Sequence, residues 1–84
     1  MAKIRQTRIY QVHFDDAKKF QCAAMTLEDA IVLFRLKHPD AAINQFLLVG
    51  AHNNWVEIEI NQIATSERVL ERVIQFARAR RATA

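Results

Sequence analysis

The segment Leu27–Pro39, LEDAIVLFRLKHP, holds more apolar residues than the single buried stripe of an ordinary surface helix requires. Thr26 followed by Asp29 forms a capping-box-like start, and Pro39 cannot continue a helix, so the pattern predicts a helix over 27–37. At about 100° per residue, two apolar stripes run along this helix. The first consists of Leu27, Ala30, Ile31 and Phe34, and the second of Val32, Leu33 and Leu36.

Three explanations compete for the second stripe. It packs against a C-terminal helix of the same chain, it forms the seam of a homodimer, or it is the docking site of a different protein. An apolar patch that stays open on a small protein usually marks an interaction site. We therefore expect Val32, Leu33 and Leu36 to be protein-interaction residues, with Arg35 as their polar rim.

The residues before this helix alternate between apolar and polar, which is typical of half-buried strands. The pattern predicts a strand over 3–14, a turn at 15–18 and a strand over 19–24. The side chains expected to face inward are Tyr10, Val12, Phe14, Phe20, Cys22 and Ala24. The two strands form a hairpin.

The residues after the helix repeat this arrangement. A run over 43–52 is apolar on both faces, with Ile43, Leu47, Val49 and Ala51 on one and Phe46 and Leu48 on the other. Asn53 and Asn54 suit a tight turn, and the next strand covers 55–60, with Val56, Ile58 and Ile60 inward. Thr65 or Ser66 is expected to cap a last helix that ends near Ala79. Its expected core stripe is Val69, Leu70, Val73, Ile74, Phe76 and Ala77.

The predicted order is β-β-α-β-β-α. Two hairpins, each followed by a helix, indicate an α+β fold with a four-stranded, mainly antiparallel sheet and both helices packed on one face. The alternative is a β-grasp-like sheet, in which the first and third strands pair in parallel. We expect one domain over residues 1–79 and a basic, frayed C-terminal tail over residues 80–84, because Arg80 and Arg81 fall within the arc of the core stripe.

The charge is unevenly placed along the 84 residues. Residues 1–14 hold Lys3, Arg5 and Arg8 without an acid, residues 15–74 carry a net −3, and residues 75–84 hold Arg78, Arg80 and Arg81 without an acid. The overall charge of +3 is therefore a property of the two ends, which weakens a general claim of polyanion binding.

The chain lacks the patterns that carry most catalytic chemistry. Its one cysteine, Cys22, excludes an internal disulfide and favours a reducing, cytoplasmic setting. The three histidines and Cys22 are scattered without metal-ligand spacing, and one glycine cannot build a phosphate-binding loop. No apolar run has the length of a membrane span. We expect neither an enzyme nor a cofactor, a bound metal or a membrane partner.

Two functions remain. The first is a small, non-enzymatic protein-binding module that docks on a larger protein or complex as an inhibitor or modulator and forms a homodimer. The alternative is a nucleic-acid-binding regulator that uses basic residues at both ends together with an aromatic on the sheet. Its residues would be Lys3, Arg5, Arg8, Trp55, Arg78, Arg80 and Arg81.

Overall fold

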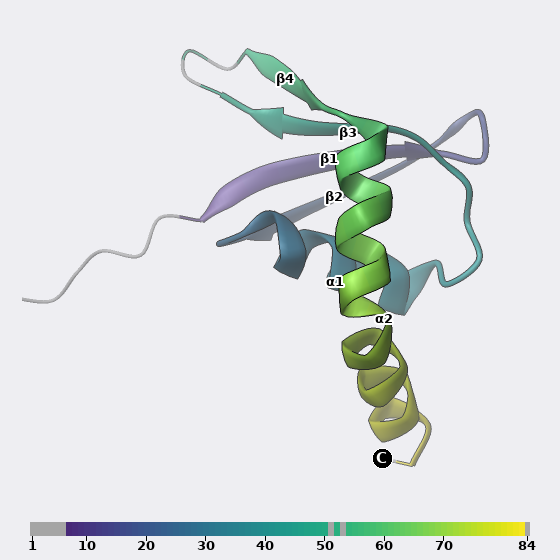
Figure 1. Cartoon of the computed structure of the whole chain (residues 1–84). Coiled ribbons are helices and arrows are strands. Elements are labelled where there is room, and N and C mark those ends of the chain that lie inside the picture. Colours follow the sequence, from purple (N-terminus) through teal and green to yellow (C-terminus); the bar gives the residue numbers. More distant parts are fainter. Residues whose placement is uncertain (1–6, 51, 53, 84) are drawn as a thin grey trace, which may run out of the picture.

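The chain folds into one four-stranded sheet with two helices against it (Figure 1). The computed structural model describes residues 7–50, 52 and 54–83, with side-chain detail to Arg80. The elements in chain order are β1 (Arg8–Phe14), β2 (Lys18–Ala24), α1 (Leu27–Lys37), β3 (Ile43–Val49), β4 (Trp55–Ile58) and α2 (Ile60–Thr83). This is the predicted β-β-α-β-β-α order of an α+β fold.

The sheet order is β2-β1-β3-β4, and every neighbouring pair is antiparallel. The β-grasp alternative is therefore wrong, because β1 and β3 run in opposite directions. The register shifts between His13 and Phe14, so that Phe14 lies opposite Ile43 and skips Asn44. This irregularity brings Ile43 against the core with Phe46, and not onto the other face with Leu47 as the alternation predicted.

The β1–β2 turn is held by the chain that leads into β3. Asp15 and Asp16 have φ angles of 46° and 68°, a left-handed geometry that aspartate tolerates better than most residues. The backbone N–H of Asp15 donates to the carbonyl of Ala42 at 2.9 Å, and the Ala42 N–H donates to the Asp15 carboxylate at 3.0 Å. The turn is thus tied to the start of β3.

The core lies between the sheet and the helices. Its buried residues are Tyr10, Val12, Phe14, Ala24, Ala30, Ile31, Phe34, Phe46 and Ile63. Within it, Phe14 and Phe20 both meet Phe34 edge-on, with ring centroids 5.2 and 5.4 Å apart, an arrangement that aromatic pairs prefer. Helix α1 packs on β2 and β1, and α2 packs on β3.

Helix α1 has its predicted bounds. The Thr26 hydroxyl accepts a hydrogen bond from the Asp29 N–H at 3.2 Å, which satisfies one of the free amides of the first turn. The helix ends at Lys37, and the His38 N–H donates to the Phe34 carbonyl at 2.8 Å before Pro39 stops the chain from continuing.

Helix α2 begins earlier than predicted. It starts at Ile60, and the Thr65 hydroxyl donates to the Asn61 carbonyl at 2.9 Å from within the helix. The expected cap at Thr65 or Ser66 is therefore wrong, because the helix follows β4 almost directly and leaves no room for a loop. Ile60 is a helical residue, 41% exposed, and not an inward strand residue.

The expected core stripe of α2 is only partly correct. Leu70 packs against the core and Ile74 and Ala77 are half-buried, but Val69, Val73 and Phe76 are 77%, 51% and 65% exposed. Ile63 of α2, which was not part of the expected stripe, is buried. Figure 1 shows the reason, since α2 crosses α1 and its C-terminal half continues beyond the rest of the molecule. The helix runs to Thr83, past the predicted end near Ala79.

Candidate protein-interaction surfaces

A groove runs between helix α1 and strand β2. It contains two shallow hollows that meet at Leu33, which is 42% exposed. One hollow, of about 600 Å³, is lined by Phe20, Cys22, Leu33, Leu36 and Lys37. The other, of about 360 Å³, is lined by Thr7, Ala23, Ala24, Met25, Asp29, Val32 and Leu33. We call this surface the α1–β2 groove.

The groove contains the three apolar residues that the sequence singled out. Leu33 is exposed, and Val32 and Leu36 are half-buried. They border the side of the sheet where β2 forms its edge. The salt bridge of α1 to α2 is made by Arg35, which points to a different side of the helix.

Strand β2 offers an open edge to this groove. Among the described residues it pairs with β1 alone, so its outer N–H and C=O groups have no strand partner there. Natural edges are commonly protected by a charge, a proline or a bulge. From Phe20 to Ala24 the sequence of β2 has none of these.

Cys22 lies in the wall of the groove. Its thiol is free and half-buried among the residues of the larger hollow. Burial raises the pKa of the Cys22 thiol above its ordinary value of 9.0, because the thiolate loses hydration there. A thiol whose pKa is raised is a poor nucleophile at neutral pH.

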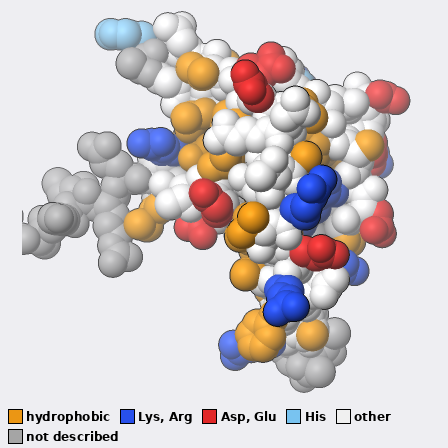
Figure 2. All heavy atoms as spheres, in the orientation of Figure 1, with side chains coloured by type: hydrophobic (Ala, Val, Ile, Leu, Met, Phe, Trp, Pro, Cys, Tyr) orange, Lys and Arg blue, Asp and Glu red, His pale blue; other side chains and the backbone are white. Residues whose placement is uncertain are grey.

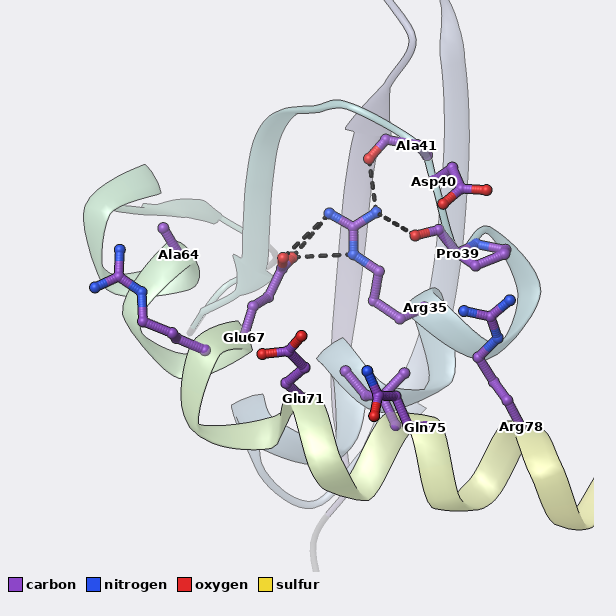
Figure 3. Close-up of a pocket in the computed structure, with 11 residues that line it drawn as sticks. Arg35, Pro39, Asp40, Ala41, Ala64, Glu67, Glu71, Gln75 and Arg78 are labelled. Carbon is purple, nitrogen blue, oxygen red and sulfur yellow. Dashed lines mark hydrogen bonds and ion pairs between the residues drawn. The ribbon is translucent and has the colours of Figure 1, made fainter.

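Arg35 was predicted to form the polar rim of Val32, Leu33 and Leu36, but its side chain points toward α2 (Figure 3). Its guanidinium donates twice to one carboxylate oxygen of Glu67, at 3.1 and 3.0 Å, and once to the other, at 3.2 Å. It also donates to the carbonyl of Ala41 at 2.6 Å. The bidentate pair joins α1 to α2, and the carbonyl contact fixes the segment before β3.

A cavity of about 500 Å³ lies beside this clamp. Glu71, Gln75 and Arg78 of α2 border it from one side, and Pro39 and Asp40 from the other (Figure 3). Its charged groups are of both signs, and Glu67 is already paired with Arg35. The cavity is open to solvent and has no arrangement of a nucleophile beside a base.

The histidines do not form a site together. The His38 ring packs against Phe14, with centroids 4.5 Å apart, and close to Phe34 and Phe20, so it is part of the aromatic packing at the end of α1. His13 contacts the Gln11 side chain at 2.8 Å on the other face of the sheet. Within residues 7–50, 52 and 54–83, no group of three or more His, Cys, Asp and Glu residues is placed to hold a metal.

The residues of the nucleic-acid hypothesis fall on separate surfaces. Trp55 lies opposite Val49 on the sheet face that the helices leave open, whereas Arg78 and Arg80 lie on α2, on the helix side. Arg8 lines a hollow with Glu57 and Glu59. Lys3 and Arg5, and the side chain of Arg81, lie outside the described part of the molecule. No single surface joins the described arginines to Trp55.

The exposed stripe on α2 is the surface that sequence reasoning missed. Val69, Val73 and Phe76 were assigned to the core, yet all three are exposed, and Val73 and Phe76 belong to the C-terminal half of the helix. Figure 2 shows hydrophobic side chains beside Lys and Arg side chains over the lower part of the molecule, where this half lies in Figure 1. The sequence signal for this was the pair Arg80 and Arg81, which fall within the apolar arc.

Comparison with known proteins gives no relative. No protein-family model, no curated protein and no solved structure matches this chain. In the part of the chain that the structure describes, none of the helices combines the length and apolarity needed to cross a bilayer.

Proposed function

We propose that this protein is a non-enzymatic protein-binding module that docks on a larger protein by binding one extended segment of it in the α1–β2 groove. The observation that carries the proposal is the open edge of β2 beside the exposed Leu33, with a hollow on each side of that leucine. Addition of a partner strand to a sheet edge is a common way of recognising peptides.

The spacing of the hollows supports an extended ligand. Cys22 borders one hollow and Ala24 the other, and these residues are two positions apart on the same strand. Side chains two positions apart on an added strand point to the same face, about 7 Å from each other. We therefore expect a ligand with small or medium apolar side chains at positions i and i+2.

The charges at the ends of the groove define the ligand further. Lys37 borders the larger hollow and Asp29 the smaller one. A complementary segment carries an acidic residue beyond the first apolar position and a basic residue beyond the second, because complementary charges favour the correct orientation.

Self-association and a cytoplasmic location complete the proposal. The exposed stripe of Val69, Val73 and Phe76 on α2 supports self-association, since apolar surface of this kind is usually covered by another protein. The free thiol of Cys22 is compatible with a reducing compartment.

The test is selection of peptides from a phage-displayed random library on the immobilised protein, followed by fluorescence polarisation with the selected peptide. We expect the consensus to alternate and to carry the two end charges. Leu33→Lys should weaken binding at least about tenfold, because it places a charge at the junction of the hollows. Gln75→Lys adds the same charge at an exposed position of α2 and should bind normally.

Main-chain pairing is tested on the peptide and not on the protein. Methylation of alternate backbone nitrogens should abolish binding, while methylation of the intervening ones should have little effect, since only every second N–H of an added strand faces β2. Peptide binding should also slow the alkylation of Cys22. A consensus without alternation, or equal binding by all methylated peptides, would refute strand addition.

Nucleic-acid binding is the second candidate, and the arginines of α2 favour it. Residues 68–83 hold five arginines and one acid, and most of this segment projects from the body. This candidate predicts a mobility shift of DNA or RNA at about 50 mM salt that disappears near 500 mM. Absence of a shift at the lower salt removes it.

A further inference from the structure

We propose that two copies of this chain associate through antiparallel pairing of their α2 helices, so that Phe76 of each copy enters an apolar-walled hollow at the base of α2 in the other. The inference names the partner for the self-association proposed above, and it does not depend on ligand binding in the α1–β2 groove. Its two parts are an apolar stripe and a complementary hollow on the same side of one helix.

The apolar stripe is Val69, Val73 and Phe76. These residues are four and three positions apart, so they follow one side of the helix. They are more than half exposed in the single chain, although each is a residue that burial stabilises. The guanidinium of Arg80 lies over the Phe76 ring, 5.8 Å from its centroid, and gives the end of the stripe a positive charge.

The hollow lies at the other end of the helix. It has a volume of about 540 Å³, and Leu27, Leu48 and Ile58 form its apolar wall. Gln62 of α2 borders it, together with Glu59 and Arg8, which carry opposite charges. Glu57 also lines it, but its carboxylate accepts a hydrogen bond from the Gln45 side chain at 3.2 Å on the other face of the sheet. The hollow therefore suits an apolar side chain, and Glu59 offers a carboxylate to a cation that lies beside it.

The helix geometry places the stripe and the hollow in register. Gln62, Val69 and Phe76 are seven residues apart, which keeps them on nearly the same side of the helix. If two α2 helices pair antiparallel about Val69, Phe76 of one copy lies level with Gln62 of the other, about 10 Å from the centre. Arg80 then lies level with the end of β4 and Glu59. Each copy thus donates one aromatic side chain and receives one.

Charge complementarity favours a second copy as the occupant. Residues 7–67 hold five basic and eight acidic side chains, whereas residues 68–83 hold five basic and one acidic. The antiparallel arrangement brings the basic half of each α2 to the acidic body of the other copy. Parallel pairing would bring two basic segments together and is disfavoured. Contact with the body also enlarges the interface toward the roughly 800 Å² per partner of stable complexes.

The first experiment is sedimentation equilibrium over a wide range of concentrations. We expect a species of twice the 9.7 kDa chain mass. Phe76→Glu should weaken association about a hundredfold or more, because it places a carboxylate against the apolar wall of the hollow and close to Glu59. Gln75→Glu adds the same charge on a side of α2 away from the stripe and should leave the dimer intact.

A charge exchange tests the register. Arg80→Glu and Glu59→Arg should each weaken association about fivefold to tenfold, and the double variant should recover most of the loss. Circular dichroism of each variant shows whether the fold is kept. A stripe that bound an unrelated protein or a nucleic acid would not show this recovery.

Disulfide trapping gives a second test of the register, in a Cys22→Ser background. Val69→Cys should crosslink to itself, because Val69 lies on the two-fold axis. Gln62→Cys and Phe76→Cys should crosslink in a mixture but not separately. A monomer at about millimolar concentration, self-crosslinking by Phe76→Cys, or an unaffected dimer in Phe76→Glu would each overturn the inference. If the protein is monomeric and still binds the selected peptide, the dimer is refuted but peptide binding in the α1–β2 groove is not.

Discussion

At the scale of single residues, Arg35 has the largest set of polar contacts in the described structure. It pairs with Glu67 through two oxygens, and its side chain is only 14% exposed. It also donates to the carbonyl of Ala41, and its guanidinium lies 5.2 Å from the Phe34 ring centroid. One side chain thus connects α1, α2 and the segment before β3.

Replacement of Arg35 should reveal this structural role in urea unfolding followed by circular dichroism. Arg35→Ala should cost about 2 kcal/mol, because Glu67 and the Ala41 carbonyl lose a charged donor. Arg35→Lys should cost about 1 kcal/mol, since an ammonium cannot reproduce the planar fork. Glu67→Gln should cost less than Arg35→Ala, because Arg35 keeps its carbonyl acceptor. An Arg35→Lys protein as stable as the wild type would contradict this account.

Cys22 gives a pH dependence whose sign follows from its raised pKa. The unfolded chain loses the thiol proton near the ordinary value of 9.0, whereas the folded chain keeps it to higher pH. The contribution of Cys22 to stability is therefore complete below about pH 8 and is lost as the pH rises through the raised value. The wild type should lose more free energy of unfolding between pH 8 and pH 10 than Cys22→Ala does. Equal losses in both proteins would show that the thiol does not contribute.

The residue types of the groove could be predicted from the sequence, but the role of Arg35 could not. Leu33 and Leu36 were recognisable because their helical angles differ from those of Phe34 and Ile31. Arg35 was assigned to a rim because its angle placed it beside that stripe. Its partner Glu67 is 32 positions away, and the crossing of α1 and α2 that brings them together is not encoded in either local pattern.

At the scale of elements, the two halves of α2 have different surroundings. Its first half packs on β3 and α1 through Ile63 and Leu70, and its second half extends beyond them. The hydrophobic pattern is nearly continuous through both halves. Periodicity shows which side of a helix is apolar, but it does not show how far along its length that side has a neighbour.

A matched pair of substitutions in α2 tests this division. Ile63→Ala should destabilise the fold by about 3 kcal/mol, because Ile63 is only 2% exposed and its loss leaves a cavity. Ile60→Ala makes the same change three residues earlier, where the side chain is 41% exposed, and should cost less than about 1 kcal/mol. Thermal unfolding of both variants checks the order. Similar losses would mean that the start of α2 is packed differently.

The strands show a similar limit of sequence reasoning. Alternation placed Tyr10, Val12 and Phe14 correctly in the core, because β1 is regular and central. Alternation failed at Ile43, because the register shift between β1 and β3 moves Ile43 to the other face of the sheet, and nothing in the local sequence indicates this shift. Val56 shares the helix side with Leu48 but is 53% exposed, because β4 is an edge strand beyond the part of the sheet that α2 covers.

At the scale of the whole molecule, charge and apolar surface are divided between the body and the end of α2. Residues 7–67 form the body, carry a net −3 and contain the buried core, whereas the segment after them is basic and carries the exposed stripe. The sequence predicted the basic end but assigned it to a frayed tail. The helix instead continues to Thr83, so Arg80 belongs to a helix and not to a frayed tail.

Deletion of residues 78–84 separates the contribution of this end to folding from its contribution to association. The core contacts of α2 are made by Ile63 and Leu70, so the free energy of unfolding of the monomer should change by less than about 0.5 kcal/mol. Association should weaken about tenfold, because Arg80 and its neighbours no longer reach the acidic body of the second copy. The remaining association should also depend less on salt between about 50 and 500 mM, since the long-range attraction between the two charged parts is the component that salt screens. Sedimentation at both salt concentrations measures these effects against the intact chain. An unchanged dimer with the same salt dependence would show that the basic end of α2 does not lie against the second copy.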